Sequence, residues 1–316
     1  MENLIVSSSP HIHTKNTTQS IMRDVLIALT PALVAGVVFF GVKALLTVAV
    51  CVITAVASEF LFNLICKKKQ TIRDLSAAVT GMLLGLSLPA NVEIWHCVVG
   101  SVFAIVVVKC LFGGIGCNFA NPAVTARVLM LIAFSSSVAG GVNTNFAEIT
   151  ASATPLEAIK NSSDAALPSL IDMMLGNRMG AIGETCAIAL LLGGIYLIVR
   201  KVISWHTPVV YIATVFILSL IIKQDFIIAL YQVLGGGLLL GAIFMATDYT
   251  TSPINKLGKI VFAFGCGLIT VLIRFFGTYP EGVSFAILLM NILSPYIEKW
   301  CMPTPLGKAG KKNEKK

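Results

Sequence analysis

The sequence predicts an all-α membrane protein with ten transmembrane helices arranged as two inverted five-helix repeats. Three observations lead to this prediction. Hydrophobic residues make up 56% of the 316-residue chain and charged residues only 12%, whereas soluble domains contain about 25% charged residues. The mean hydropathy is +0.88. Apolar runs of membrane-spanning length recur along the chain, and basic residues collect in alternate connecting segments.

The apolar runs give the order of the helices. Crossing a bilayer takes roughly 17 to 25 apolar residues. The runs lie at about 24–41, 44–65, 75–90, 94–113, 122–139, 181–200, 205–222, 226–247, 258–275 and 282–298. Residues 1–23 are polar at their start and contain no apolar signal-peptide core, so we expect a cytoplasmic N-terminal segment with no cleavable signal.

The distribution of Lys and Arg predicts the orientation. With a cytoplasmic N-terminus, 18 of the 23 basic residues fall in cytoplasmic segments, including a basic tail at 301–316. Such an excess is typical of cytoplasmic segments of membrane proteins. The net charge of +8 is then explained by basic ends facing anionic lipid, and no nucleic-acid partner is expected. Five basic residues remain outside: Lys43, Lys160, Arg178, Lys223 and Arg274.

A long polar loop at 140–180 separates the halves 24–139 and 181–300. An odd number of helices in each half would place two related halves in opposite orientations, as in inverted repeats. Weak internal similarity supports this: 81–85 is similar to 236–241, and an Asn and a Pro follow two helices later, as Asn121-Pro122 and as Asn291 with Pro295. Such repeats often build a midplane site from interrupted helices, so we expect a translocation or cofactor core.

Polar interruptions locate this core. Asn118 and Asn121 follow a glycine-rich stretch and precede Pro122, which suits the first position of a helix. Their amides offer donors and acceptors to a flat ligand, although Asn121 is equally suited to be a helix N-cap. In the second half, Asp248 ends the eighth apolar run. It is either a solvated acid at a helix end or a ligand acceptor.

Few acids lie near membrane depth: Glu59, Glu184, Glu281 and Glu298. An unpaired carboxylate there is costly, so each is a candidate for an ion or proton path, with Glu59 and Glu281 singled out. Glu281 also suits the first turn of the tenth helix, where the helix dipole stabilises it. The eight Cys include no C-x-x-C pair and the four His are dispersed, so no metal site is expected. No nucleotide-binding motif is present.

The outer loop contains Thr154-Pro155-Leu156-Glu157, which has the pattern of a capping box. Thr154 would be the N-cap and Pro155 the first helical residue. A helix N-terminus also favours a phosphate group, so a phosphate esterified to Thr154 would meet free amides there. The residues alone leave both a structural cap and a modification site open.

Five blocks in order carry a resemblance over nearly the whole chain. They are 9–13 with 21–25, 113–123, 245–248, 279–282 through Asn291, and 153–156. The chain resembles the D subunits of Rnf electron-transport complexes, a family shared with the B subunits of sodium-translocating NADH:quinone reductases. Only about 23 residues precede the first apolar run, whereas the quinone-reductase relatives have a longer polar segment, so the Rnf type is favoured.

The resemblance implies a flavin-carrying subunit of a redox-driven ion pump. In the family, a flavin transferase links FMN to a threonine through a phosphoester outside the cytoplasm, which corresponds to Thr154 here. A riboflavin is bound noncovalently, and the residues similar to that site are Asn118 and Asn121, with Asp248 assigned to either flavin. Electrons would pass from the flavin of the G subunit through FMN to riboflavin and toward the A, B, C and E subunits.

The implied complex is a translocase of the bacterial inner membrane, a ferredoxin:NAD⁺ oxidoreductase that moves Na⁺ or H⁺. This chain would carry no catalytic residue and no complete site for NAD or ferredoxin. The usual modification motif has Asp six residues before the threonine, Ser or Thr three before it, and Gly two before it. This chain departs from the motif, because Glu148, Ala151 and Ser152 stand at these three positions. Two other hypotheses predict different behaviour: a flavin-free secondary transporter binding a small solute between the repeats, and a purely structural membrane subunit.

Overall fold

The computed structural model describes most of the chain between residues 17 and 303. The predicted N-terminal segment up to residue 16, much of the polar loop with Glu148 and Ala153, Pro280 of the 279–282 block, and the tail from residue 304 lie outside the described residues. The described ranges are 17–138, 141–142, 151–152, 154–160, 168–279 and 281–303.

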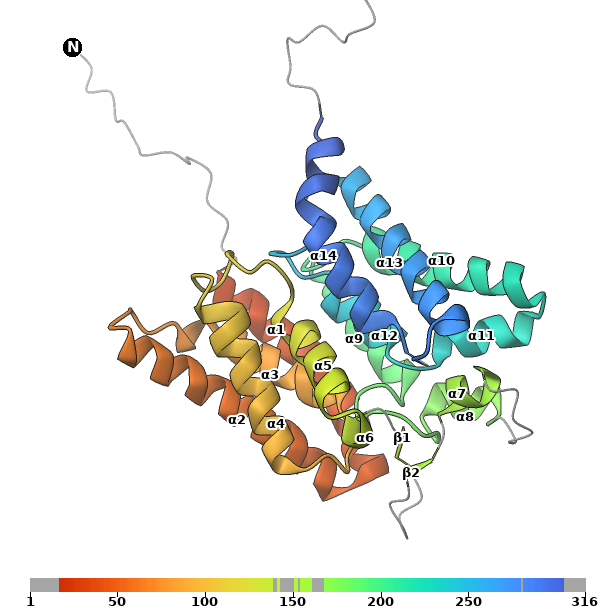
Figure 1. The fold of residues 1–316 in the computed structure, drawn as a ribbon, viewed down its shortest axis with the longest axis horizontal. Helices are drawn as coiled ribbons and strands as arrows, with labels where there is room; N and C mark the ends of the chain where they lie inside the picture. The colour runs from red at the N-terminus through yellow and green to blue at the C-terminus, as the bar shows by residue number, and fades with distance from the viewer. Residues whose placement is uncertain are drawn as a thin grey trace, which may run out of the picture.

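The described elements are almost entirely helical, which confirms the predicted all-α class. Figure 1 shows the helices of the first half on one side and those of the second half on the other. The first half comprises α1 (Thr18–Phe40), α2 (Val42–Ile65), the 3₁₀ turn η1 (Ile72–Asp74), α3 (Ser76–Ser87), α4 (Ile94–Val102) continued by the π-helix η2 (Phe103–Cys110), and α5 (Pro122–Ala133). The second half comprises α9 (Ala187–Val199), α10 (His206–Lys223), α11 (Phe226–Leu234), α12 (Leu238–Leu240) continued by the π-helix η3 (Gly241–Met245), α13 (Lys256–Phe276) and α14 (Val283–Trp300).

Short elements connect the halves. A two-residue antiparallel pair joins β1 (Gly141–Val142) to β2 (Ala151–Ser152). Three short helices complete the connection: α6 (Ser135–Val138), α7 (Pro155–Lys160) and α8 (Leu170–Leu175). Both α7 and α8 pack against α11. The connecting region therefore touches the second half at its interrupted helix.

Each of the ten predicted segments coincides with a helix or an interrupted helix. Length and composition, however, qualify only four described helices as membrane spans, namely α1, α2, α10 and α13. A fifth is counted if α11 and α12 with η3, which meet at a 60° bend, form one span. The structure thus confirms a multi-pass membrane protein, while the count of ten spans and the inverted repeats stay predictions.

Small residues allow close packing within and between the halves. In the first half, a Cβ at Gly81 would lie 2.7 Å from the Val52 Cα, because α3 packs tightly on α2. Between the halves, Gly193 of α9 leaves no room for a Cβ beside the Ala28 carbonyl of α1. Close backbone approach of this kind is characteristic of helix packing in membranes. Packing of α5 on α14 provides a second contact between the halves.

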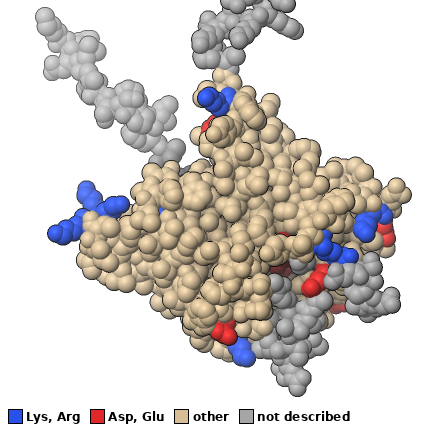
Figure 2. All heavy atoms as spheres, viewed as in Figure 1, with Lys and Arg blue, Asp and Glu red and all other residues tan. Residues whose placement is uncertain are grey.

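Most of the surface shown in Figure 2 is uncharged. Acidic and basic side chains appear in a few small groups at the edges of this face and toward its lower right. Large apolar side chains such as Val34, Ile53 and Ile221 are more than half exposed. A surface of this composition suits contact with lipid or with other membrane subunits, rather than with water.

Candidate functional site

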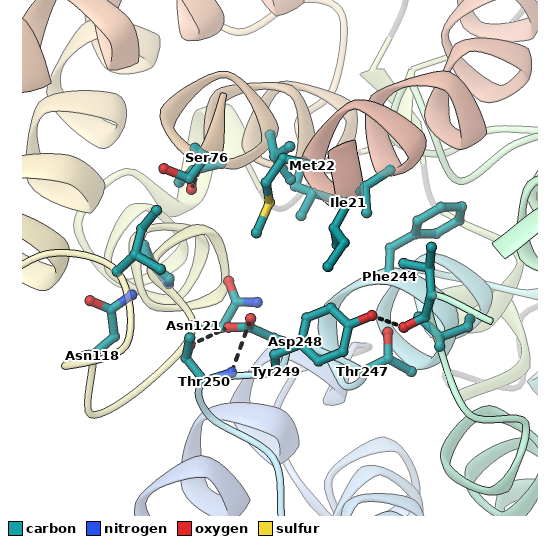
Figure 3. A pocket seen from close by; sticks show the side chains of 18 of the residues that line it. Ile21, Met22, Ser76, Asn118, Asn121, Phe244, Thr247, Asp248, Tyr249 and Thr250 are labelled. Carbon is teal, nitrogen blue, oxygen red and sulfur yellow. Dashed lines mark hydrogen bonds between the residues drawn. The ribbon is translucent and has the colours of Figure 1, made fainter. Parts of the chain in front are cut away.

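A pocket between the two halves brings together the three predicted ligand residues. We call it the α1 pocket; it is bordered by α1, α3, the 115–122 segment, α9 and the 247–250 segment. Asn118, Asn121 and Asp248 all line it. In Figure 3, Ile21 and Met22 of α1 lie across the opening from Asp248 and Tyr249. Two segments more than 120 residues apart in sequence therefore form one cavity.

The two asparagines have different roles in this pocket. The Asn121 Oδ1 accepts hydrogen bonds from the backbone N–H groups of Ala123 (3.0 Å) and Val124 (3.4 Å), which makes it the N-cap of α5. Its Nδ2 donates to the Met245 carbonyl at 3.3 Å. The Asn118 Oδ1 is buried and has no hydrogen-bond partner in the described part of the chain. Asn118 is thus the amide with an unused acceptor, and the capping role of Asn121 is confirmed.

Asn291 ties the asparagine of the first half to the second half. In the amide orientation that satisfies both polar atoms, its Oδ1 accepts from the Asn121 backbone N–H at 3.1 Å and its Nδ2 donates to the Thr251 carbonyl at 3.3 Å. Asn291 lies on α14 and is 2% exposed. The similarity between 121–122 and 291–295 in the sequence therefore corresponds to direct contact in the structure.

Asp248 is half-buried in a tight polar turn, where its carboxylate is held by neighbouring threonines. Its Oδ2 accepts from the hydroxyl groups of Thr250 (3.1 Å) and Thr251 (3.2 Å). Burial raises the pKa of the Asp248 carboxyl, and these hydrogen bonds oppose the increase. The adjacent Tyr249 hydroxyl donates to the Val202 carbonyl. These contacts fix the second-half wall of the α1 pocket.

Lys109 is the one basic residue among those described that line the α1 pocket, and a buried ion pair neutralises it. The Lys109 Nζ lies 2.9 Å from Glu59 Oε1, and both side chains are 2% exposed. Lys109 also donates to the Ser76 hydroxyl at 2.6 Å, and the Thr71 hydroxyl donates to Glu59 Oε1 at 2.6 Å. The Glu59 Oε2 has no partner among the described residues. A candidate ion-path acid is therefore held by a neighbouring helix.

A second group of charges surrounds the break between α11 and α12. Gly236 adopts a φ of +63°, which glycine tolerates without strain. Arg274 of α13 donates to the Gly235 carbonyl at 3.2 Å and to the Gln232 carbonyl, at the C-terminal end of α11. Glu281 accepts from the Gly237 N–H at 3.1 Å, at the start of α12. The cationic Arg274 thus lies at the C-terminal end of α11 and the anionic Glu281 at the N-terminal end of α12, which is the arrangement that the two helix dipoles favour.

Glu281 therefore differs from the expectation that it occupies the first turn of the tenth helix. It lies two residues before α14, and the helix end that it stabilises belongs to α12. Arg127 of α5 bridges it to Glu184, with distances of 2.8 Å to Glu281 Oε2 and 3.2 Å to Glu184 Oε1. Arg178 donates to the carbonyls of Glu184 and Thr185. The fourth predicted acid, Glu298, is only partly buried on α14.

Thr154 occupies the predicted N-cap position of α7. Its Oγ1 accepts from the Glu157 N–H at 3.4 Å, and Pro155 is the first helical residue. Thr154 itself is half-buried, whereas Pro155 and Leu156 are buried. A Cβ at Gly236 would lie 2.8 Å from the Leu156 side chain. The helix that begins at Thr154 therefore packs directly on the break in the α11–α12 segment.

Sequence reasoning missed the buried cations. Lys109 and Arg127 were assigned to cytoplasmic segments in the charge count, and Arg274 to the outside. The structure buries all three, with exposures of 2%, 5% and 3%. The signal in the sequence was their position inside or at the edge of an apolar run, where a basic residue requires a partner. Glu59 was singled out on the same ground, but its partner Lys109 is 50 residues away in sequence.

Among the described residues, no three or more His, Cys, Asp or Glu side chains lie close enough together to hold a metal ion.

The fold and the site define a helical membrane protein with a polar pocket between its halves and a charged cluster at an interrupted helix. The chain belongs to the NQR2, RnfD, RnfE family, whose model matches residues 5–307.

Curated relatives are similar along nearly their full length. The D subunit of a Na⁺-translocating ferredoxin:NAD⁺ oxidoreductase complex from Acetobacterium woodii is 46% identical, with 99% of this chain and 98% of the relative covered. The corresponding subunit of a proton-translocating complex from Clostridium ljungdahlii is 39% identical, with 96% of each covered. The D subunit of an ion-translocating oxidoreductase complex from Alcanivorax borkumensis is 35% identical, with 96% of this chain and 97% of the relative covered.

Proposed function

We propose that this chain is the flavin-carrying membrane subunit of an Rnf-type complex, which couples electron transfer between ferredoxin and NAD to movement of Na⁺ or H⁺. Family membership and the names of the relatives support the complex. The observation that carries the flavin assignment is the meeting of Asn118, Asn121 and Asp248 from opposite halves in one pocket. Flavins would supply the redox chemistry, and the protein their position and electrostatic environment.

The α1 pocket suits riboflavin, which carries no phosphate. Its basic residue Lys109 is paired with Glu59, and its acid Asp248 is held by two threonines. Among the described lining residues, no uncompensated cation is therefore left to attract a phosphate. The Asn118 amide lines the pocket and offers hydrogen-bonding groups to the N–H and C=O edge of an isoalloxazine ring. Phe244 and Tyr249 add aromatic surface to the lining.

Thr154 is proposed to carry FMN through a phosphoester at its Oγ1. The hydroxyl stands at the half-buried start of α7, so a transferase could reach it from one side. The hydrogen bond that it accepts from the Glu157 N–H is long, at 3.4 Å, so its loss on ester formation costs little. The packing of Leu156 against the helix break would hold the modified residue close to the membrane part.

An inverted-repeat topology is consistent with the packing. In the first half, α2 packs against α3 and α4; in the second, α10 packs against α11 and α13. The helices α1 with α9 and α5 with α14 then form matching contacts between the halves. Positive φ angles recur at Leu75 (61°), just before α3, and at Gly236 (63°), just before α12 in the interrupted helix of the second half. With ten spans, both termini would be cytoplasmic and the Thr154 loop outside.

The proposed ion path passes the buried ion pairs. The pair of Glu59 with Lys109 is buried and that of Glu281 with Arg127 is partly buried, and a change in charge nearby could release either carboxylate to a cation or a proton. The relatives include complexes named for Na⁺ and for H⁺. The proposed partners are the A, B, C, E and G subunits of Rnf, the last as the source of electrons, and the flavin transferase during maturation.

Mass measurement of the Thr154 peptide tests the proposal. The full chain is purified from a host that contains the flavin transferase, as the natural protein and as Thr154→Ala. We expect an added mass of FMN less one water on this peptide, lost in Thr154→Ala and kept in the control Thr144→Ala, which lies upstream of the modification motif. An unmodified peptide together with no extractable flavin would favour the flavin-free transporter that binds a small solute between the halves.

A further inference from the structure

A second cavity is lined by three basic residues that come from three different elements. We call it the α7 pocket. Lys160 belongs to α7, Lys223 ends α10 and Arg274 lies in the last turn of α13. Its volume is about 50 Å³, and no acidic residue among those described lines it. The space therefore suits a small anionic group.

The basic residues in this pocket are only partly used by the protein. Lys160 donates to the carbonyls of Gly277 (2.6 Å) and Tyr279 (2.9 Å), which leaves one of its three N–H groups. Arg274 is 3% exposed, and its Nε has no partner among the described residues. Lys223 lies 5.9 Å from the centre of the Phe275 ring and makes no ion pair within the described part of the chain.

The nearest acids cancel only part of the charge at the cavity. Glu281 lies near Arg274, since a Cβ at Gly236 would be 2.6 Å from Glu281 Oε1 and 3.1 Å from an Arg274 guanidinium nitrogen, but Glu281 also pairs with Arg127 and binds the start of α12. Asp225 follows Lys223 closely but is used as the N-cap of α11, accepting from the Ile227 N–H at 2.8 Å. An excess of positive charge therefore remains at the α7 pocket, and an anion would be attracted to it.

The position of the pocket indicates a membrane surface. Both α10 and α13 qualify as membrane spans, and they end at Lys223 and Phe276. Exposed apolar side chains flank these ends, including Ile221, Phe226 and Phe276, which are 60% to 74% exposed. Basic side chains at the ends of spans reach to the level of lipid headgroups, while apolar neighbours contact the acyl chains.

We propose that the α7 pocket binds the phosphate group of a membrane phospholipid. The phosphate would receive charge-assisted hydrogen bonds from Lys160, Lys223 and Arg274. The same chemistry would suit free phosphate, but the flanking apolar residues favour a lipid. Thr154 does not line this cavity, so the site is separate from the phosphate of the proposed FMN and does not depend on flavin attachment.

The proposal also accounts for the exceptions in the charge distribution. In the predicted topology only five basic residues lie outside, and three of them line this pocket. A fourth, Arg178, is buried against the carbonyls of Glu184 and Thr185. Only Lys43 is an ordinary exposed lysine at the start of α2. Lys43 therefore provides a matched control for Lys223.

Native mass spectrometry of the full chain in detergent tests the proposal, with dioleoylphosphatidylglycerol as the probe and phosphate-free dioleoylglycerol as the comparison. We expect one phosphatidylglycerol to be retained in preference to dioleoylglycerol. Lys223→Gln should weaken its binding about tenfold, because one charge-assisted hydrogen bond is lost. Lys223→Arg should restore it, and Lys43→Gln should bind as the natural chain does. Lys223 makes no structural hydrogen bond in the described chain, so the thermal midpoint should stay unchanged.

Three outcomes would overturn the proposal. Equal retention of dioleoylglycerol would mean that acyl chains alone are bound. An equal loss in Lys43→Gln and Lys223→Gln would mean that the effect is one of general surface charge. Displacement of the lipid by excess inorganic phosphate would assign the pocket to free phosphate, and the lipid assignment would be wrong.

Discussion

The α1 pocket and the α7 pocket differ in whether the charged side chains that line them are paired. In the α1 pocket, Glu59 neutralises Lys109 and two threonines hold Asp248, so the unused polar atom is the neutral Asn118 amide. In the α7 pocket, three cations meet without an acid in the described lining. The difference teaches that the number of charges near a cavity says little about its ligand. The charge left after internal pairing indicates a neutral ligand for one pocket and an anion for the other.

The largest expected effect comes from removing the charge balance of the α1 pocket. Glu59→Gln leaves the Lys109 ammonium buried without a counter-charge, which should destabilise the protein by about 3 to 5 kcal/mol. Thermal unfolding of the purified chain in detergent measures the change. The double variant Glu59→Leu/Lys109→Met should recover much of the loss, and Lys68→Gln on the exposed loop is the control. Equal stability of Glu59→Gln and the natural chain would show that the ion pair is dispensable.

A smaller effect is expected at the helix break beside the α7 pocket. In Gly236→Ala, the new Cβ would meet the Glu281 carboxylate at 2.6 Å and force a positive φ on alanine. We expect a loss of about 1 to 3 kcal/mol, measured by thermal unfolding. Gly41→Ala is the matched control, because Gly41 has a φ of +70° with nothing within 4 Å of its added Cβ. Identical losses would mean that backbone strain alone, without the contact with Glu281, explains the effect.

Binding of the neutral ligand in the α1 pocket should depend on the Asn118 side chain. Asn118→Ala removes this amide and should weaken noncovalent flavin binding about tenfold, the equivalent of one hydrogen bond of about 1.4 kcal/mol. Flavin extracted from the purified chain by acid, and counted per chain, measures this. Asn121→Ala is the contrast, because it should lower stability by about 1 kcal/mol through loss of the α5 cap. Unchanged flavin content in Asn118→Ala would contradict the assignment.

The smallest expected effect is that of salt, which should weaken ligand binding in the α7 pocket and leave ligand binding in the α1 pocket unchanged. Raising the ionic strength screens the cations of the α7 pocket, of which Lys223 is exposed. We expect phosphatidylglycerol retention to fall about two- to threefold between low and high salt, while flavin retention in the α1 pocket stays constant. Parallel measurements of both ligands on one sample provide the test. A parallel fall of both would mean that salt alters the fold and not the individual sites.

Much of the fold could be predicted from local sequence, because apolar runs and breaks determine where helices begin and end. Asn121 and Pro122 marked the start of α5, and Thr154 and Pro155 that of α7. Nearness of Asn118 to Asp248 followed only from the resemblance and the repeat. The ion pairs could not be predicted, because the partners of Arg127 are 57 and 154 residues away. No periodicity or local propensity identifies such partners.

The separation between Arg127 and Glu281 has a consequence for how the chain enters the membrane. Arg127 lies in the second turn of α5, and 154 residues separate it from Glu281. At about 5 to 20 residues per second, a ribosome needs on the order of 10 s to make that stretch. During this interval the guanidinium lacks the Glu281 carboxylate, and for the first part of it Glu184 as well. We therefore expect α5 to reach its final position only after the segment with Glu281 has been made, so that the packing of the first half is completed together with the second.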